Sequence, residues 1–156
     1  MSRAGALVTA SVVLVVTALG CGDDGGDEPV FPADYAATYQ EVRDCRGSAD
    51  HDLGQIRVLA DPAALGPYQA RDVPFPLGAV VLKVEYDFGD PDCTGEITQW
   101  TVMKREDGGD AAALGWRWQR VDRQRRVVTE NEPRCFGCHL NCGVPPDGYL
   151  GTCAVP

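Results

Sequence analysis

The sequence predicts an α+β fold, in which a helix, a strand and a second helix precede a meander of antiparallel strands. Two observations predict it. Apolar residues recur at helical spacing early in the folded chain, and later stretches alternate apolar and polar residues as half-buried strands do. No internal repeat or second domain is visible, so a single domain is expected over residues 31–156.

Two helices are expected early in this domain. Residues 31–44 form the first, because Tyr35, Tyr39 and Val42 recur at spacings of four and three and give an apolar stripe. The second begins with an Asp-Pro pair at Asp61, which places a capping side chain at the N-cap and a proline at the first helical position.

Strands are expected where β-branched and aromatic residues cluster. In the clearest of them, alternation places Leu82 and Val84 on one face and Lys83 and Glu85 on the other. The expected strands cover residues 55–60, 79–88, 96–104, 115–121 and 126–129. Together they give the antiparallel sheet of the predicted fold.

Residues 1–20 have the composition of a signal peptide. Arg3 supplies a positive charge, and the apolar stretch that follows is short for a membrane span. The Ala-Leu-Gly-Cys sequence ending at Cys21 resembles a bacterial lipobox, in which this cysteine is lipidated; an ordinary secretory signal is the alternative. We therefore expect an exported, membrane-anchored lipoprotein facing the periplasm or the cell surface. The outer membrane is favoured, because Gly22 rather than an acidic residue follows Cys21.

An acidic, Gly-rich segment, residues 21–30, separates the lipid attachment site from the domain. It has almost no apolar side chain to bury, so it is expected to be a flexible tether. The formal net charge of the chain is -9, which opposes nucleic-acid binding, since phosphate recognition needs clustered cations.

Cys135, Cys138 and His139 form a C-x-x-C-H motif, the attachment signature of a c-type haem. Two thiols add to the two vinyl groups of one porphyrin, and an imidazole ligates its iron. Positions i, i+3 and i+4 share one face of a helix, so all three side chains address the same flat ligand. The motif predicts one covalently attached haem c, with Cys135 and Cys138 as thioethers and His139 as the proximal iron ligand.

A structural disulfide and a zinc site are the alternatives to haem. Cys142 and Cys153 would complete a small zinc knuckle with the motif, but an oxidising compartment opposes free thiolates. The cysteine count favours haem, because one lipid attachment, two thioethers and two disulfides account for all seven. Among the three pairings of the remaining four, we favour the short loop Cys142–Cys153, which leaves Cys45 to pair with Cys93.

The late position of the motif excludes an ordinary small cytochrome c, which has its motif near the N-terminus and a methionine ligand downstream. Here 17 residues follow His139 and none is Met. Three blocks, residues 56–62, 75–85 and 135–139, instead occur in the order of the cytochrome P460 family, which includes the β-sheet cytochromes c-prime, and the chain resembles that family. The resemblance implies an antiparallel sheet of about five strands with two helices, a haem packed against the sheet, and usually a homodimer.

The resemblance also implies distal residues. In the P460 enzymes a lysine is linked to the haem edge, and Lys83 holds the matching position, while a distal arginine falls at Arg57. Those enzymes oxidise hydroxylamine with a catalytic glutamate. Here Gln99 or Trp100 matches its position and Glu96 is the nearest acid, which argues against that reaction. The candidate catalytic residues are therefore Arg57, Lys83 and Glu96.

Four functions follow from these features. The favoured one is a monohaem cytochrome whose open sixth iron position binds NO or a related nitrogen species, or serves redox chemistry. The alternatives are a hydroxylamine-oxidising enzyme with a haem modified by Lys83, and a membrane-surface electron carrier with a redox partner protein and an iron capped by His51 or water. A haem-free lipoprotein held by disulfides or zinc is the fourth.

Overall fold

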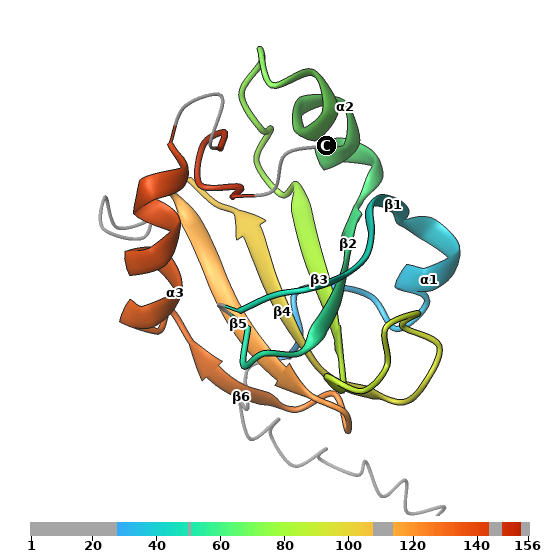
Figure 1. The fold of residues 1–156 in the computed structure, drawn as a ribbon. Helices are drawn as coiled ribbons and strands as arrows, with labels where there is room; N and C mark the ends of the chain where they lie inside the picture. The colour runs from blue at the N-terminus through green and yellow to red at the C-terminus, as the bar shows by residue number, and fades with distance from the viewer. Residues whose placement is uncertain (1–27, 50, 108–113, 144–147, 154–156) are drawn as a thin grey trace, which may run out of the picture.

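The computed structural model describes residues 28–49, 51–107, 114–143 and 148–153. These residues form one six-stranded antiparallel sheet, whose strands neighbour one another in chain order, from β1 at one edge to β6 at the other (Figure 1). The strands are β1 Gln40–Gly47, β2 Gln55–Ala60, β3 Val80–Tyr86, β4 Ile97–Arg105, β5 Trp116–Asp122 and β6 Val127–Glu130. No helix among the described residues is long and apolar enough to cross a membrane.

Three short α-helices accompany the sheet among these residues: α1 Tyr35–Thr38, α2 Pro62–Ala70 and α3 Pro133–His139, the last followed by a 3₁₀ turn, Leu140–Cys142. The predicted start of α2 is confirmed, because the Asp61 side chain accepts a hydrogen bond from the Ala64 amide at 2.7 Å. α3 lies beside β5 and β6 in Figure 1. The predicted α+β class with an antiparallel sheet is therefore confirmed.

The helix expected over residues 31–44 is wrong beyond one turn. α1 ends at Thr38, Tyr39 is extended, and the residues that follow pair with β2 as a sixth strand. An isolated short helix is marginally stable, whereas an edge strand gains a ladder of hydrogen bonds. The strand count therefore rises from the expected five to six, and the register shifts on either side of Arg43 mark bulges that bend β1.

The two faces of the sheet carry separate apolar clusters. On one face, called the α3 face below, residues such as Val58, Val81 and Trp118 pack with α2 and with Cys135 and Phe136 of α3. The other face buries Leu82, Val84, Trp100, Val102 and Val121 under the N-terminal segment, through Phe31 and Tyr35. The alternation expected for β3 is confirmed up to Tyr86. Phe88 lies beyond the strand and is 71% exposed.

Strand register aligns one polar row on the α3 face. The row runs across β3, β4 and β5 through Lys83, Thr101 and Arg120, each opposite the next. Apolar Val58 continues it on β2, opposite Lys83. Glu85 and Gln99 are opposite one another two residues along. This row lies in the middle of the sheet, so its side chains point into the space between α3 and the sheet.

Both predicted disulfides are present. Cys45 bonds to Cys93, and Cys142 bonds to Cys153. Cys135 and Cys138 are the free cysteines of the described chain. The expected signal peptide, the lipidation site Cys21 and most of the tether lie outside the described residues.

Candidate functional site

A cavity of about 540 Å³ lies between α3 and the α3 face of the sheet. Its floor is formed by β2 to β5, with Val58, Val81 and Met103 among its apolar residues. Cys135, Cys138 and His139 line it from α3. Cofactor sites in proteins typically enclose roughly 300–1,000 Å³ of mostly apolar space with a few polar groups. The space is therefore large enough for a cofactor.

α3 brings the three residues of the motif to the cavity. Pro133 starts the helix, and the spacing of Cys135, Cys138 and His139 puts them on one side of it. Cys135 is partly buried and Cys138 is exposed. Burial, with the nearby Glu132 carboxylate adding to it, raises the pKa of the Cys135 thiol. Two unpaired thiols thus face one cavity from one helix.

His139 is buried and held in one tautomer. It is 6% exposed, and its Nδ1 is hydrogen-bonded to the Gly151 carbonyl. A carbonyl only accepts, so Nδ1 carries the proton and Nε2 keeps a lone pair free to bind a metal. Burial, with the charge of Lys83 adding to it, lowers the pKa of His139 to about 3. At neutral pH the imidazole is therefore neutral, as a metal ligand must be.

The carbonyl that orients His139 belongs to a C-terminal strap, residues 148–153. The Cys142–Cys153 disulfide ties it to the end of α3, and Trp116 Nε1 donates to the Leu150 carbonyl at 2.8 Å. Gly151 has φ +88°, and a Cβ there would lie 3.1 Å from a Leu114 methyl group. Any other residue at 151 would therefore strain this path of the strap, which favours glycine.

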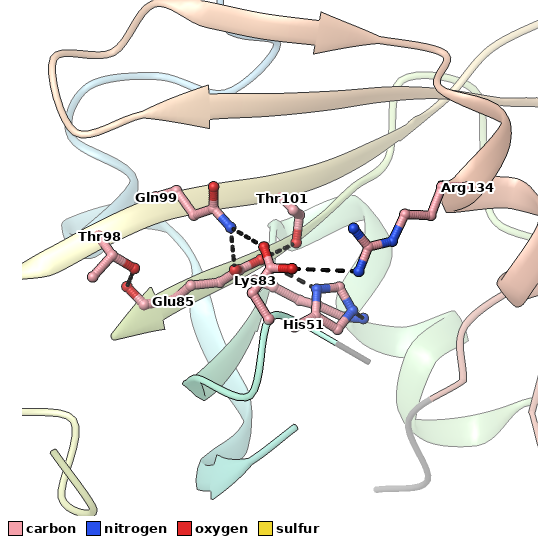
Figure 2. Close-up of polar contacts among 8 residues, drawn as sticks. His51, Lys83, Glu85, Thr98, Gln99, Thr101 and Arg134 are labelled. Carbon is pink, nitrogen blue, oxygen red and sulfur yellow. Dashed lines mark hydrogen bonds and ion pairs between the residues drawn. The ribbon is translucent and has the colours of Figure 1, made fainter. Parts of the chain in front are cut away.

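A chain of polar contacts crosses the cavity floor (Figure 2). Lys83 Nζ lies 2.6 Å from His51 Nε2, and His51 Nδ1 lies 3.2 Å from Glu85 Oε1. Glu85, only 2% exposed, also accepts hydrogen bonds from Gln99 at 2.7 Å and Thr101 at 2.8 Å. Burial alone would raise the pKa of Glu85, but these hydrogen bonds, with that of His51 first, hold it below its usual value. Glu85 is therefore an ionised carboxylate, and His51 donates to it through Nδ1.

Four arginines line the cavity within the described chain, and two of them, Arg43 and Arg120, have buried nitrogen atoms without partners. Nε and Nη1 of Arg43, on β1, are buried, and within the described chain they have no hydrogen-bond partner; the same holds for Nε of Arg120, on β5. Burial, followed by the charge of Arg46, lowers the pKa of Arg43. Buried donors without partners cost stability, so these guanidinium groups suit an anionic group in the cavity.

The structure brings together only part of the predicted site. Lys83 joins Cys135, Cys138 and His139 at the cavity, as the resemblance implies. Arg57 does not: strand alternation turns it to the opposite face, where it contacts Glu41 Oε2 at 3.2 Å and the Asp92 carbonyl at 2.9 Å.

Glu96 and Trp100 are also displaced from the site. The Glu96 side chain is 93% exposed and lies 3.8 Å from Arg123. Trp100 packs in the opposite core and donates to the Tyr35 hydroxyl. Gln99, in contrast, reaches the cavity. Of the residues expected from the resemblance as distal groups, Lys83 and Gln99 thus line the cavity, whereas Arg57, Glu96 and Trp100 do not.

Sequence reasoning did not identify Glu85, Arg43 and Arg120 as site residues. Glu85 could have been identified from the sequence, because it is two residues from Lys83 and therefore on the same face of the strand. No sequence feature pointed to Arg43, since the segment around it was expected to be helical. His51, considered as an iron cap, instead bonds through both ring nitrogens to Lys83 and Glu85.

Replacing Glu85 with Gln tests the buried polar chain. Because the folded-state pKa of Glu85 is depressed, its carboxylate stabilises the fold above its usual value of 4.5, and this contribution is lost as the pH falls through the folded-state pKa. We expect the free energy of unfolding of Glu85→Gln to be about 1–3 kcal/mol lower at pH 7, with the difference shrinking below about pH 4.5. Urea titrations across pH 7 to 3 measure it. The exposed Glu96→Gln is the control, and a difference independent of pH would contradict the assignment.

Comparison with known proteins accords with this geometry. No curated protein matches the chain significantly. The sequence pattern of the family described as Cytochrome P460 matches residues 32–143, more than half of the chain, and this range includes Lys83 and the whole C-x-x-C-H motif. Such a match implies a haem cofactor and the character of a c-type cytochrome. The chain belongs to the cytochrome P460 family.

Proposed function

We propose that this protein is an exported monohaem c-type cytochrome whose sixth iron position is open and binds a small ligand such as NO or a related nitrogen species. One observation carries the proposal: two free thiols and a neutral, buried imidazole lie on one side of α3, facing a cavity of about 540 Å³. Haem would supply an iron that binds small ligands and exchanges electrons with a redox partner.

The residues of the cavity suit this group. Cys135 and Cys138 would each form a thioether by adding a thiol across a vinyl group, and His139 would offer Nε2 to the iron. Arg43 lies on β1, a different wall from α3. In haem the propionates are on the edge opposite the vinyl groups. Nε and Nη1 of Arg43, which have no hydrogen-bond partner among the described residues, would therefore suit a propionate.

An open sixth position is supported by the state of His51. The sequence contains two histidines, and His51 is the one left after His139. Capping the iron with His51 would break its contacts with both Lys83 and Glu85 and leave the buried Glu85 carboxylate with one donor fewer. A bis-histidine electron carrier is therefore disfavoured.

Hydroxylamine oxidation is the second candidate function. Its support is the location of Lys83, which lines the same cavity as both free cysteines, where a link to the haem edge could form. Its weak point is the acid, because Glu96 is at the surface and Glu85 is engaged by three donors.

Haem attachment is the direct test of the proposed function. Protein produced with a haem-maturation system should give a c-type pyridine haemochrome and a mass increase of one haem. Cys135→Ala/Cys138→Ala should abolish both, because no thiol remains to form a thioether, whereas Cys45→Ser/Cys93→Ser should retain them. Haem-free protein from well-matured cells would contradict the proposal. A Soret band of the P460 type, far to the red, would instead favour the enzyme.

The role of Arg43 is tested by the reduction potential. Arg43→Met removes a positive charge that favours the reduced, less positive haem. We expect the potential to fall by roughly 20–60 mV, as removal of one partly buried charge near the haem implies. Spectroelectrochemistry on the holoprotein measures the shift, with Arg57→Met, on the opposite face, as the matched control. Equal potentials of Arg43→Met and the unsubstituted protein would refute propionate pairing.

Export and lipidation complete the proposal, and they rest on the lipobox-like sequence before Cys21. Cys21 would carry more than one acyl chain, as stable anchoring requires. The protein should therefore sediment with the outer membrane after cell fractionation, and Cys21→Ser should move it to the soluble periplasmic fraction. Retention of Cys21→Ser in the membrane would argue against a lipid anchor at this position.

A further inference from the structure

Lys83 and Arg120 flank Thr101 in one cross-strand row on the cavity floor. Their backbones are two strand spacings apart, or about 9–10 Å, and both side chains line the cavity. Nε of Arg120 is buried and has no hydrogen-bond partner among the residues that the structure describes. The row thus places two cationic side chains on either side of a hydroxyl-bearing residue, with room between them for a small molecule.

The contacts of Lys83 define its state of charge. Glu85 is ionised and accepts a hydrogen bond from the Nδ1–H group of His51, so His51 Nε2 carries a lone pair. This lone pair accepts from Lys83 Nζ at 2.6 Å. An ammonium can make this donation and still direct its other N–H groups elsewhere, and the buried negative charge of Glu85, relayed through the imidazole, favours the charged form.

The other charged groups around the cavity are of both signs. Arg120 from β5 and Arg43 from β1 are cationic and line the same cavity, while Cys135 and His139 from α3 are neutral neighbours that feel the charge of Lys83. Arg134, at the start of α3, is exposed and pairs with Asp52 at 3.3 Å. Arg46 is a further cation of the cavity wall, and Asp52 and Glu132 are carboxylates that line it. The Glu85–His51 pair contacts Lys83 directly and therefore favours a cation on the floor.

We propose that Glu85 and His51 fix Lys83 as an ammonium ion and that Lys83 and Arg120 together form a subsite for a small anion in the cavity. This inference rests on the proposed function and deepens it, because it adds a ligand class for the same site: small anions, such as azide or oxidised nitrogen anions. Glu85 and His51 are positioning residues, and Lys83 and Arg120 contact the anion.

The charge of Lys83 is measured on haem-free protein, so this test does not depend on haem. Lys83 and Lys104 are the only lysines of the sequence, and Lys104 lies on the opposite face and serves as an internal reference. Competitive acetylation with acetic anhydride, followed by peptide mass spectrometry from pH 6 to 11, gives the titration midpoint of each amine. We expect the midpoint of Lys83 to be no lower than that of Lys104.

Removing the buried carboxylate should free the amine. Glu85→Gln should lower the midpoint of Lys83 by about one pH unit or more, as loss of an adjacent opposite charge does, and leave Lys104 unchanged. The control is Glu132→Gln, which removes a carboxylate that lines the cavity without contacting His51. A Lys83 midpoint well below that of Lys104 in the unsubstituted protein, or no change in Glu85→Gln, would overturn the fixed ammonium.

The anion subsite is measured on the holoprotein. Lys83→Met and Arg120→Met should each weaken azide binding to the ferric form about tenfold or more, the effect of losing a charge-assisted hydrogen bond, while the CO affinity of the ferrous form changes less than about threefold. Lys104→Met should leave both affinities unchanged. Unchanged azide affinity in Lys83→Met, or equal loss of azide and CO affinity, would overturn the subsite, whereas absence of haem would overturn only the proposed function.

Discussion

The hydrogen bond between His139 Nδ1 and the Gly151 carbonyl is the interaction on which the site depends. It fixes the tautomer that leaves Nε2 available, and it holds a neutral ring against Trp118, with the ring centroids 4.6 Å apart. The strap that supplies the carbonyl lies outside the residues matched by the family pattern. The carbonyl that orients His139 thus comes from a segment beyond the matched range.

Strand alternation decides which polar residues reach the cavity. Lys83, Thr101 and Arg120 share a row on the α3 face, whereas Arg57, one residue from the row member Val58, points to the opposite face. Two residues adjacent in sequence, Arg57 and Val58, therefore lie on opposite faces, one in a surface ion pair and the other at the cavity. This constraint gives the cavity floor two cationic side chains, Lys83 and Arg120, and one buried carboxylate, Glu85, on which the proposed anion subsite rests.

The fold class, both disulfides and the C-x-x-C-H motif could be predicted because each rests on a local pattern or on a count, whereas the location of Lys83 was predicted from the family resemblance. It did not allow the edge strand β1 to be predicted, since the helical stripe of Tyr35 and Tyr39 extends into residues that pair with β2 only in the folded sheet. Arg43 and the Gly151 carbonyl were missed for the same reason: their roles depend on contacts between segments far apart in the chain.

The location of Cys142 has a consequence for biogenesis. It is four residues from Cys138, on the turn that directly continues α3, while its partner Cys153 lies at the far end of the strap. An oxidant that joined Cys138 to Cys142 would consume one of the two thiols that the proposed haem attachment uses and would leave the strap untied. Under the proposed function, the order in which the thiols react would therefore decide between haem attachment and a disulfide isomer without haem.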